Sequence, residues 1–445
     1  MQEFDLAEKV LEDVVENDTY FNEALRKIFQ ANVNLRPMRG MVAGIVGCEL
    51  RHHILFEYLL QDLTDYTPAE KRTLSLALAN LYFYKHIKKE DIIAILQEKL
   101  SEEKFNAASE LIAKADQEGP FIPESIAKHS NKYLSLRFNT PEWVLKIFEH
   151  YGYGSTYKIL KKNNRPFSST VRVRTSAIPA EEVIAKFPDF KESHVEGILT
   201  YAGKESLRKN PLMKDGTLFK EKPVTKEIVD KYHIEEPNEI FVWNGNADSS
   251  LLKEVIENYG ASIGINLGVP NLDQYADVSR LIKQKQLKNV NFFGSSLDSL
   301  LVSISRPQDL VICAPASSNF DLIREQPDYL LHFNKGGMDE LFAQEKEALL
   351  ETSKFVAEGG TFIYMIYTIS KKEGHQTIFD FMANHPEFQF VEERQYFPYE
   401  EGETALYYAV LHKDSNVAKT SAPLSEILGN EQQGVYAQTS AAPAK

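Results

Sequence analysis

Only two residues of the sequence, Cys48 and Cys313, could supply a reactive thiol. Cys48 and His52 are four residues apart, so a helix would place them on one face, with His53 beside them. Two or three ligands without a second cluster favour ordinary packing over a metal site. Cys313 lies in the apolar run "DLVICAPA", which favours a small buried hydrophobic side chain over an active thiol.

A second set of residues could bind phosphate. The formal net charge is −14, yet residues 131–223 carry seventeen Lys and Arg against ten Asp and Glu, a local net charge of +7. Between Tyr151 and Thr175 there is no acid, and the cations of this stretch, here called the basic patch, are Lys158, Lys161, Lys162, Arg165, Arg172 and Arg174. The aromatic residues among them (Tyr151, Tyr153, Tyr157, Phe167) could stack on bases, so RNA contact is favoured over a solvated charge run. Arg172 and Arg174 would share one face of a strand and are the strongest candidates for phosphate contacts.

The first part of the chain reads as successive helices. Apolar residues recur at spacings of three and four in "GMVAGIVGCELRHHILFEYLLQDL", which is typical of an amphipathic helix. Thr67 before Pro68 predicts a helix start, with the threonine as N-cap and the proline at the first helical position. No strand signal interrupts this pattern, so residues 1–125 are predicted to form an all-α domain.

The rest of the chain mixes strands and helices. Residues 126–225 are predicted to form a linker helix and a small α/β domain that carries the basic patch. From residue 226 to 414, short apolar strands alternate with helices, which predicts a parallel, doubly wound, Rossmann-like domain. Asp248, after the first strand, is interpreted as a helix N-cap rather than a displaced cofactor ligand. Residues 415–445 are rich in Ser, Ala, Gln and Pro and are predicted to be disordered.

Three segments, in order, resemble the Sun (RsmB-type) 16S ribosomal RNA cytosine-5 methyltransferases. "GIVGCELRHHILFEYLL" and "LALANLYFYKHIKKED" resemble the NusB-like helical domain of that family. "RFNTPEWVLKIFEHYG" followed by "VRVRT" resembles its linker motif and strand, through Pro141, Trp143, Arg172 and Val173. "VICAPASSNFDLIREQPDYL" resembles its D-A-P-C-S-G motif with a downstream Pro327-Asp328 pair, and "EGGTFIYMIYTIS" resembles its G-G-x-L-V-Y-x-T-C-S strand.

The resemblance implies a chemistry that these residues do not reproduce. In the family, a cysteine thiolate adds to carbon 6 of cytosine and so activates carbon 5, a second cysteine helps to release the product, and an aspartate contacts the base. Those three positions correspond here to Tyr367, Ala316 and Cys313. A phenol has an ordinary pKa near 10 and stays protonated at neutral pH. No other cysteine exists in the C-terminal domain.

The resemblance also implies S-adenosylmethionine as cofactor, held by a glycine-rich turn and by acids after the second and third strands. Here the turn reads "VWNGNADSS" and keeps only Gly245, and the two acids correspond to Asn266 and Ser295. The sequence therefore favours an RNA-binding protein, with ribosomal RNA as the expected partner, that has lost both cofactor and activity.

Two other hypotheses stay open: an active S-adenosylmethionine-dependent RNA methyltransferase with a rebuilt site, and a scaffold that binds a partner protein through the NusB-like domain. The N-terminus lacks a signal peptide pattern and no apolar run reaches the roughly 18 residues of a membrane span, so we expect a cytoplasmic protein without membrane contact and without a bound metal.

Overall fold

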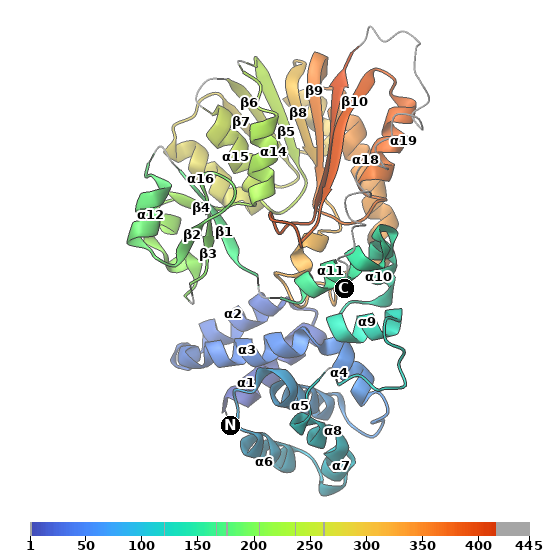
Figure 1. Ribbon diagram of the computed structural model, residues 1–445. Helices are drawn as coiled ribbons and strands as arrows, with labels where there is room; N and C mark the ends of the chain where they lie inside the picture. Colours follow the sequence, from blue (N-terminus) through green and yellow to red (C-terminus); the bar gives the residue numbers. More distant parts are fainter. Residues whose placement is uncertain are drawn as a thin grey trace, which may run out of the picture. The chain divides into compact units, whose positions relative to one another are not determined.

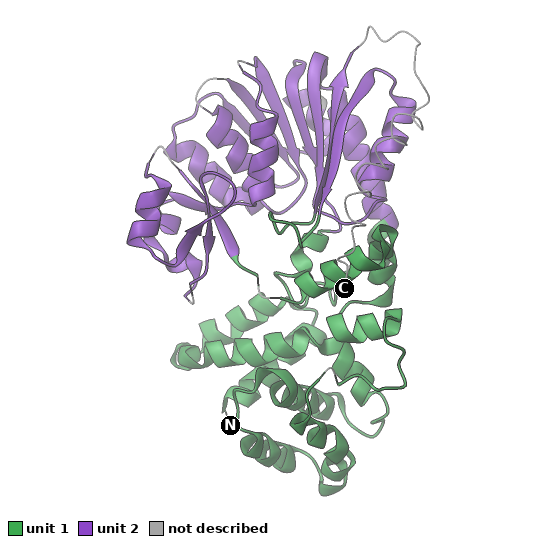
Figure 2. Ribbon diagram, viewed as in Figure 1, with its two compact units in different colours: residues 1–168, 319–338, 397–405 green, residues 169–318, 339–396, 406–445 purple. Residues whose placement is uncertain are grey.

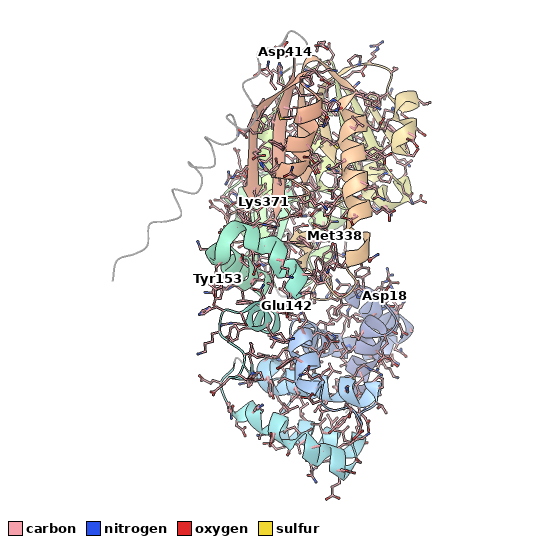
Figure 3. All side chains as sticks on the ribbon, turned by 90° about the vertical axis from the view of Figure 1, so that its right-hand side faces the viewer. Asp18, Glu142, Tyr153, Met338, Lys371 and Asp414 are labelled. Atoms are coloured by element: carbon pink, nitrogen blue, oxygen red, sulfur yellow. The ribbon has the colours of Figure 1, made fainter. Side chains whose placement is uncertain are left out.

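The structure is a computed structural model that describes residues 2–119, 121–165, 167–174, 177–203, 205–235, 237–260 and 263–414, without the side chain of residue 301. The chain forms two compact units, and neither is continuous in sequence (Figure 2). The first contains residues 1–168, 319–338 and 397–405, and the second contains residues 169–318, 339–396 and 406–445. Asp414, labelled in Figure 3, is the last described residue, so the predicted disordered tail 415–445 lies outside the described residues.

The N-terminal part of the first unit is helical, as predicted, and no strand occurs among its described residues 2–119. Its elements are α1 (Gln2–Val15), α2 (Phe21–Ala31), η1 (Val33–Met38), α3 (Arg39–Leu50), α4 (His53–Leu60), α5 (Pro68–Ala79), η2 (Asn80–Tyr84), α6 (Lys89–Lys99), α7 (Glu102–Ala107), α8 (Ser109–Ala113) and η3 (Lys114–Asp116). Thr67 caps α5 in a reciprocal capping box with Glu70, which confirms the predicted helix start. The apolar faces of these helices enclose one core around Phe4, Phe29 and Phe56.

Later segments of the chain complete the first unit. They are the helices α9 (Asn131–Phe138), α10 (Glu142–Phe148), η4 (Glu149–Tyr151) and α11 (Gly152–Asn163), together with two stretches from the C-terminal half. Residues 319–338 contain both η8 (Phe320–Ile323) and η9 (Lys335–Gly337), and the second stretch is residues 397–405. The indole of Trp143 stacks on Phe333 at a centroid distance of 5.5 Å. Phe148 meets the buried ring of Phe320 edge to face at 5.9 Å. These aromatic contacts attach the loop after residue 318 to the helical unit.

The second unit begins with a small antiparallel sheet in the order β2-β3-β1-β4. Its strands are β1 (Ser169–Val173), β2 (Phe190–Glu192), β3 (Ile198–Tyr201) and β4 (Leu218–Lys220), accompanied by α12 (Ala180–Lys186), η5 (Leu207–Lys209) and α13 (Pro211–Lys214). The helix α14 (Pro223–Lys231) leads into the large sheet. The boundary between the units falls after residue 168, so the helices of the stretch 126–225 before it belong to the first unit and the strands after it to the second. The predicted domain bounds 126 and 225 stay a prediction.

The large sheet has seven strands in the order β10-β11-β9-β8-β5-β6-β7. They are β5 (Glu239–Asn244), β6 (Gly264–Val269), β7 (Val290–Gly294), β8 (Gln308–Ala314), β9 (Val356–Ile366), β10 (Phe388–Tyr396) and β11 (Leu406–Lys413). The first five run parallel, and β11 pairs antiparallel with both β9 and β10. This order and the alternating helices confirm the predicted Rossmann-like fold.

Helices cover both faces of this sheet (Figure 1). Alternate strand residues enter different cores: Val242, Leu267 and Ile312 pack with α14, α15 (Ser250–Tyr259) and α16 (Ala276–Gln284). Their neighbours Phe241, Val311 and Cys313 pack on the opposite face with α17 (Leu300–Ser303), α18 (Met338–Ser353) and α19 (His375–Asn384). The remaining short turns are η6 (Leu272–Tyr275) and η7 (Leu297–Ser299). Among the described residues, no helix has the length and apolar character needed to cross a bilayer.

Candidate functional site

The carboxyl ends of β5, β8 and β9 meet at one edge of the large sheet, which is where ligands of parallel α/β folds are held. Gly245 follows β5 directly, and its N–H donates to the carbonyl of Ala314 at 2.7 Å. A Cβ at Gly245 would lie 2.6 Å from the backbone nitrogen of Ala316. Glycine is therefore required here by the close approach of the loop after β8.

The remainder of the turn after β5 is filled by the chain itself. Asn246 is buried, and its side-chain amide donates to the carbonyl of Pro315 at 2.8 Å. The carbonyl of Asn246 accepts a hydrogen bond from the hydroxyl of Tyr275, a side chain with no exposed surface. Burial raises the pKa of Tyr275 to about 12, so the phenol remains a donor. These contacts hold the turn from the inside.

Tyr367, which the motif resemblance aligns with the family's nucleophile, directly follows β9 and is almost completely buried. Its hydroxyl lies 2.9 Å from that of Thr225, and the ammonium nitrogen of Lys222 lies 4.0 Å from its ring centroid. Burial raises the pKa of the phenol well above its usual range, and the positive charge of Lys222 opposes this only in part. Tyr367 is therefore held as a neutral, hydrogen-bonded hydroxyl.

Cys313 and Ala316 are the residues that the motif resemblance aligns with the family's other two catalytic positions. Cys313 lies inside β8 with no exposed surface, and burial raises the pKa of its thiol to about 12, with a smaller opposing effect of Thr352. This burial agrees with the sequence interpretation of Cys313 as a small hydrophobic side chain. Ala316 carries no functional group. The three positions thus lie at the expected edge of the sheet and present no thiolate or carboxylate.

A buried polar cluster stands beside them. Glu373 accepts hydrogen bonds from the backbone N–H of Ser318 at 2.7 Å, from the hydroxyl of Ser318 at 2.7 Å and from the hydroxyl of Thr368 at 2.6 Å. Glu345, on α18, is also buried. Burial, followed by the negative charge of Glu373, raises the pKa of Glu345 to about 11. The bonds to Glu373 join the loop after β8 to the loop after β9 and fix their conformations.

The two residues predicted to stand for the cofactor's acids lie in different surroundings. Asn266 pairs with Phe241 in the middle of β6, and its amide donates to the side chain of Gln308, the first residue of β8, at 3.1 Å. Asn266 thus lies inside β6, whose carboxyl end is Val269, and its ribose contact stays a prediction. Ser295 does follow β7 directly, and its hydroxyl donates to the carbonyl of Ser296 at 2.9 Å.

Neither the end of β6 nor the turn after β5 reproduces the seat that the family resemblance implies for S-adenosylmethionine. Pro270 follows β6, and Asn271 then accepts from the N–H of Asp273 as the cap of η6. Asp277, further along, pairs with Lys253 at 3.0 Å. Asp248 accepts from the N–H of Ser250, the first residue of α15, at 2.9 Å and also pairs with Lys222 at 3.4 Å. The N-cap position of α15 is Ser249, so the interpretation of Asp248 as the N-cap is wrong by one residue. The carboxylates of Asp248 and Asp277 are thus already bonded to other groups of the chain.

The basic patch divides into two parts. Lys158, Lys161 and Arg165 are exposed in α11 and just after it, in the first unit. Tyr153 of the same helix, labelled in Figure 3, is 47% exposed. Lys162 pairs with Glu403 of that unit. The exposed members combine positive charge with an aromatic ring, which suits a nucleic acid backbone and an unstacked base.

Arg172 and Arg174, on and beside β1 in the second unit, do share one face, but that face meets α15. The guanidinium of Arg172 donates to the buried Glu254 at 3.2 Å, and Arg174 lies 3.4 Å from Glu257, which also pairs with Lys285 at 2.7 Å. Both arginine side chains are less than a fifth exposed. Their predicted phosphate contacts are therefore not supported, because carboxylates of α15 already occupy both cations.

The downstream Pro327-Asp328 pair has a structural partner. Asp328 is buried and accepts from the N–H of Phe21, the first residue of α2, at 2.7 Å. His332 lies between Asp328, at 3.3 Å, and Asp18, at 2.7 Å. Asp328 thus supplies the cap that Tyr20 does not provide for α2. All of these contacts lie within the first unit.

The residues around Cys48 form a packed cluster. His53 pairs with the buried Glu49 at 2.8 Å, and His52 stacks on Phe83 at a centroid distance of 3.7 Å. Burial raises the pKa of the Cys48 thiol to about 12. Among the described residues, no group of three or more His, Cys, Asp or Glu is arranged to hold a metal ion.

Sequence reasoning missed Lys222 and Glu373. Pro223 at the first position of α14 is a helix-start signal that would have placed Lys222 at the border of helix and sheet. Glu373 follows the predicted strand by only a few residues, but nothing local indicates that the loop after β8 returns to it.

Comparison with known proteins gives a consistent relationship. No family model matches the chain. A curated relative, the probable ribosomal RNA small subunit methyltransferase B of Bacillus subtilis, is 22% identical over 418 residues, which cover 86% of this chain and 89% of the relative. This match along most of both chains confirms the resemblance predicted from the motifs.

Solved structures share the fold. The crystal structure of PH0851 aligns with a TM-score of 0.72 at 16% identity, over 92% of this chain and 98% of that one. A methyltransferase homolog protein from Pyrococcus horikoshii aligns with a TM-score of 0.54 at 13% identity, over 64% of this chain and all of that one. NSun6 from Pyrococcus horikoshii, solved with SFG, aligns with a TM-score of 0.54 at 12% identity, over 62% and 99% of the two chains.

Proposed function

We propose that this protein, a relative of ribosomal RNA small subunit methyltransferase B along most of its length, binds RNA and does not methylate it. Because the relative is a ribosomal RNA small subunit methyltransferase, RNA is the expected partner, and small-subunit ribosomal RNA is the first RNA to test. The proposed inactivity rests on one observation above all: the nucleophile's position holds Tyr367, a buried neutral phenol bonded to Thr225. Carbon 5 of cytosine cannot be activated without a nucleophile that adds to carbon 6.

We also propose that the protein no longer binds the methyl donor. Because the relatives are methyltransferases, S-adenosylmethionine is the methyl donor whose binding should be tested. The turn at Gly245 packs against the loop at Ala316, and Val269 and Pro270 stand where the ribose-binding acid is expected at the end of β6. We therefore expect the affinity for S-adenosylmethionine to be lost together with the chemistry.

RNA contact is assigned to the exposed members of the basic patch, Lys158, Lys161 and Arg165, with Tyr153 as a stacking surface. The test is an electrophoretic shift with a small-subunit ribosomal RNA transcript at several salt concentrations. Removing all three cations by alanine should weaken binding and reduce the salt slope by about 2 to 3, because each phosphate contact contributes roughly 0.7 to 0.9. A control variant removes three exposed lysines elsewhere: Lys88, Lys283 and Lys288.

The activity assay separates this proposal from a rebuilt methyltransferase. The parent protein is incubated with the transcript and S-adenosylmethionine carrying a labelled methyl group, and the nucleosides are then analysed by mass spectrometry. We expect no labelled nucleoside. A labelled methyl group on any base or ribose would overturn the proposed inactivity, and calorimetric binding of S-adenosylhomocysteine at micromolar concentration would overturn the proposed loss of the cofactor.

A further inference from the structure

The helical part of the first unit carries a second cationic surface, separate from the basic patch. Residues 1–125 contain fourteen Lys and Arg against twenty-two Asp and Glu, a net charge of −8. Within them, residues 24–48 contain four cations, Arg26, Lys27, Arg36 and Arg39, and no acid. Residues 24–48 are therefore positively charged, although residues 1–125 as a whole are negatively charged.

The structure places the four cations in residues 26–40, a stretch whose polar side chains lie on the surface. It comprises the exposed side of α2, the turn η1 and the start of α3. Arg26 and Lys27 have side-chain exposures of 59% and 55%, and Arg36 and Arg39 are also exposed. None of the six residues of η1 is buried. The buried positions of α2 are Phe21, Ala24, Leu25 and Phe29, so its outward face is the one that carries the cations.

The cations of this surface are only weakly compensated. Arg26 and Lys27 share a single carboxylate, that of Glu23, at 3.6 and 3.8 Å. Arg36 and Arg39 have no carboxylate within 4.0 Å among the described residues. Exposed pairs of this kind contribute little stability, so a competing anion can replace the carboxylate readily. The four cations thus remain available to an anionic partner.

Polar side chains that can read RNA accompany these cations. Gln30, Asn32 and Asn34 are exposed along the same 26–40 segment. Amide side chains donate and accept hydrogen bonds and can contact phosphate, the ribose 2′-hydroxyl and base edges. Arginine, as at Arg36 and Arg39, matches phosphate with two parallel hydrogen bonds. The combination fits a phosphodiester chain better than an acidic protein surface, which would offer no bases or ribose to the amides.

We propose that residues 26–40, through Arg26, Lys27, Arg36 and Arg39, form a second RNA-binding surface of this protein. This inference rests on the proposed function and extends it. The RNA would contact two surfaces of the first unit, α11 with its following turn and the α2–η1–α3 segment, so that the two contacts act together on one molecule. Binding through two linked surfaces raises the overall affinity above that of either surface alone.

The test compares the full-length parent with Arg36→Ala, Arg39→Ala on a small-subunit ribosomal RNA transcript, by electrophoretic shift across a salt series. Loss of two phosphate contacts should weaken binding on the order of tenfold and reduce the salt slope by about 1.4 to 1.8. Arg36→Lys, Arg39→Lys keeps the charge and should retain most of the slope. Lys9→Ala, Lys88→Ala removes the same charge from exposed residues of the same unit and should bind like the parent.

The possible outcomes separate the inference from the proposed function. If the parent binds and the Arg36, Arg39 double alanine variant binds equally well with the same slope, the second surface is excluded while RNA binding stands. If the parent does not bind the transcript, the proposed function fails and the inference with it. Competition by poly-glutamate that equals competition by poly-uridylate at equal charge would overturn RNA as the partner of this surface. Unchanged circular dichroism and melting temperature verify that each exposed variant is folded.

Discussion

The hydroxyl of Tyr367, the residue that the motif resemblance aligns with the family's nucleophile, lies 2.9 Å from the hydroxyl of Thr225. Lys222, next to the proline that starts α14, covers the same ring at 4.0 Å. The site is therefore closed by groups of the chain that satisfy one another. The hydrogen bond between Tyr367 and Thr225 and the cation–π contact of Lys222 both stabilise the fold.

Restoring the thiols should not restore methyl transfer. In Ala316→Cys, Tyr367→Cys both cysteine positions of the family are refilled, but the turn at Gly245 and the end of β6 are unchanged. We expect no methylated cytosine in a small-subunit ribosomal RNA transcript after incubation with S-adenosylmethionine, measured by nucleoside mass spectrometry. An active cytosine-5 methyltransferase of known specificity, assayed on the same transcript, controls for the substrate. Methylated cytosine from the double variant would mean that the cofactor site is intact.

Gly245→Ala should destabilise the second unit. A methyl group there would lie 2.6 Å from the backbone nitrogen of Ala316, which cannot move as a flexible side chain would. We expect a loss of about 1 to 3 kcal/mol in the free energy of unfolding, seen as a lower melting temperature. Gly154→Ala is the matched control, because nothing lies within 4 Å of its added methyl group in α11. Equal melting temperatures for the two variants would contradict the close packing of the turn.

The periodicity of apolar residues predicts which segments form helices and which form strands, and it predicts the parallel sheet. The alternating strands and helices after residue 226 predicted the parallel sheet, and Thr67 with Pro68 predicted a helix start that the capping box bears out. These features depend on neighbours in sequence. Cys313 was also interpreted correctly, because an apolar run around a cysteine predicts burial.

Contacts between distant segments could not be predicted in this way. Arg172 and Arg174 were interpreted as phosphate ligands, but Glu254 and Glu257, eighty residues later, face them from α15. The place of Asn266 inside β6 could not be predicted either, because motif matching does not determine strand register. The packing of residues 319–338 with the helical unit likewise depends on side chains such as Asp328, whose partner Phe21 lies three hundred residues away.

Arg172→Ala, Arg174→Ala should reduce stability more than RNA binding. The double variant leaves Glu254 without its guanidinium, and burial already raises the pKa of Glu254. Removing one partner of a buried ion pair costs about 3 to 5 kcal/mol, so we expect a clear drop in the melting temperature of the second unit. At a temperature where the variant is folded, its salt slope for RNA binding should equal that of the parent. A shallower salt slope with unchanged stability would indicate that Arg172 and Arg174 contact RNA phosphates after all.

Glu345→Gln should change the pH dependence of stability. Burial and the charge of Glu373 raise the pKa of Glu345 to about 11 in the folded protein, against an ordinary value of 4.5. The folded state therefore holds a proton that the unfolded state releases above about pH 4.5, and the stability of the parent falls as pH rises from there. The glutamine is neutral in both states, so the variant should gain stability relative to the parent between pH 5 and pH 9. Glu347→Gln, an exposed residue on the same helix, is the control and should show no such trend.

His53 should stabilise the first unit as a cation. Burial alone would lower its pKa, but the charge and hydrogen bond of Glu49, with a further contribution from Glu57, raise the pKa to about 10. Between the unfolded value near 6.5 and this folded value, the folded protein binds the extra proton. The stabilisation is therefore complete below pH 6.5 and is lost as pH rises through 10.

His53→Gln removes that cation and leaves Glu49 buried beside a neutral amide. We expect a loss of about 3 kcal/mol near pH 6, decreasing as the pH approaches 10, measured by chemical unfolding of the full-length protein across the pH range. His86→Gln, at an exposed position, provides the matched control. A loss that is constant with pH would show that His53 is neutral in the folded state and acts through packing alone.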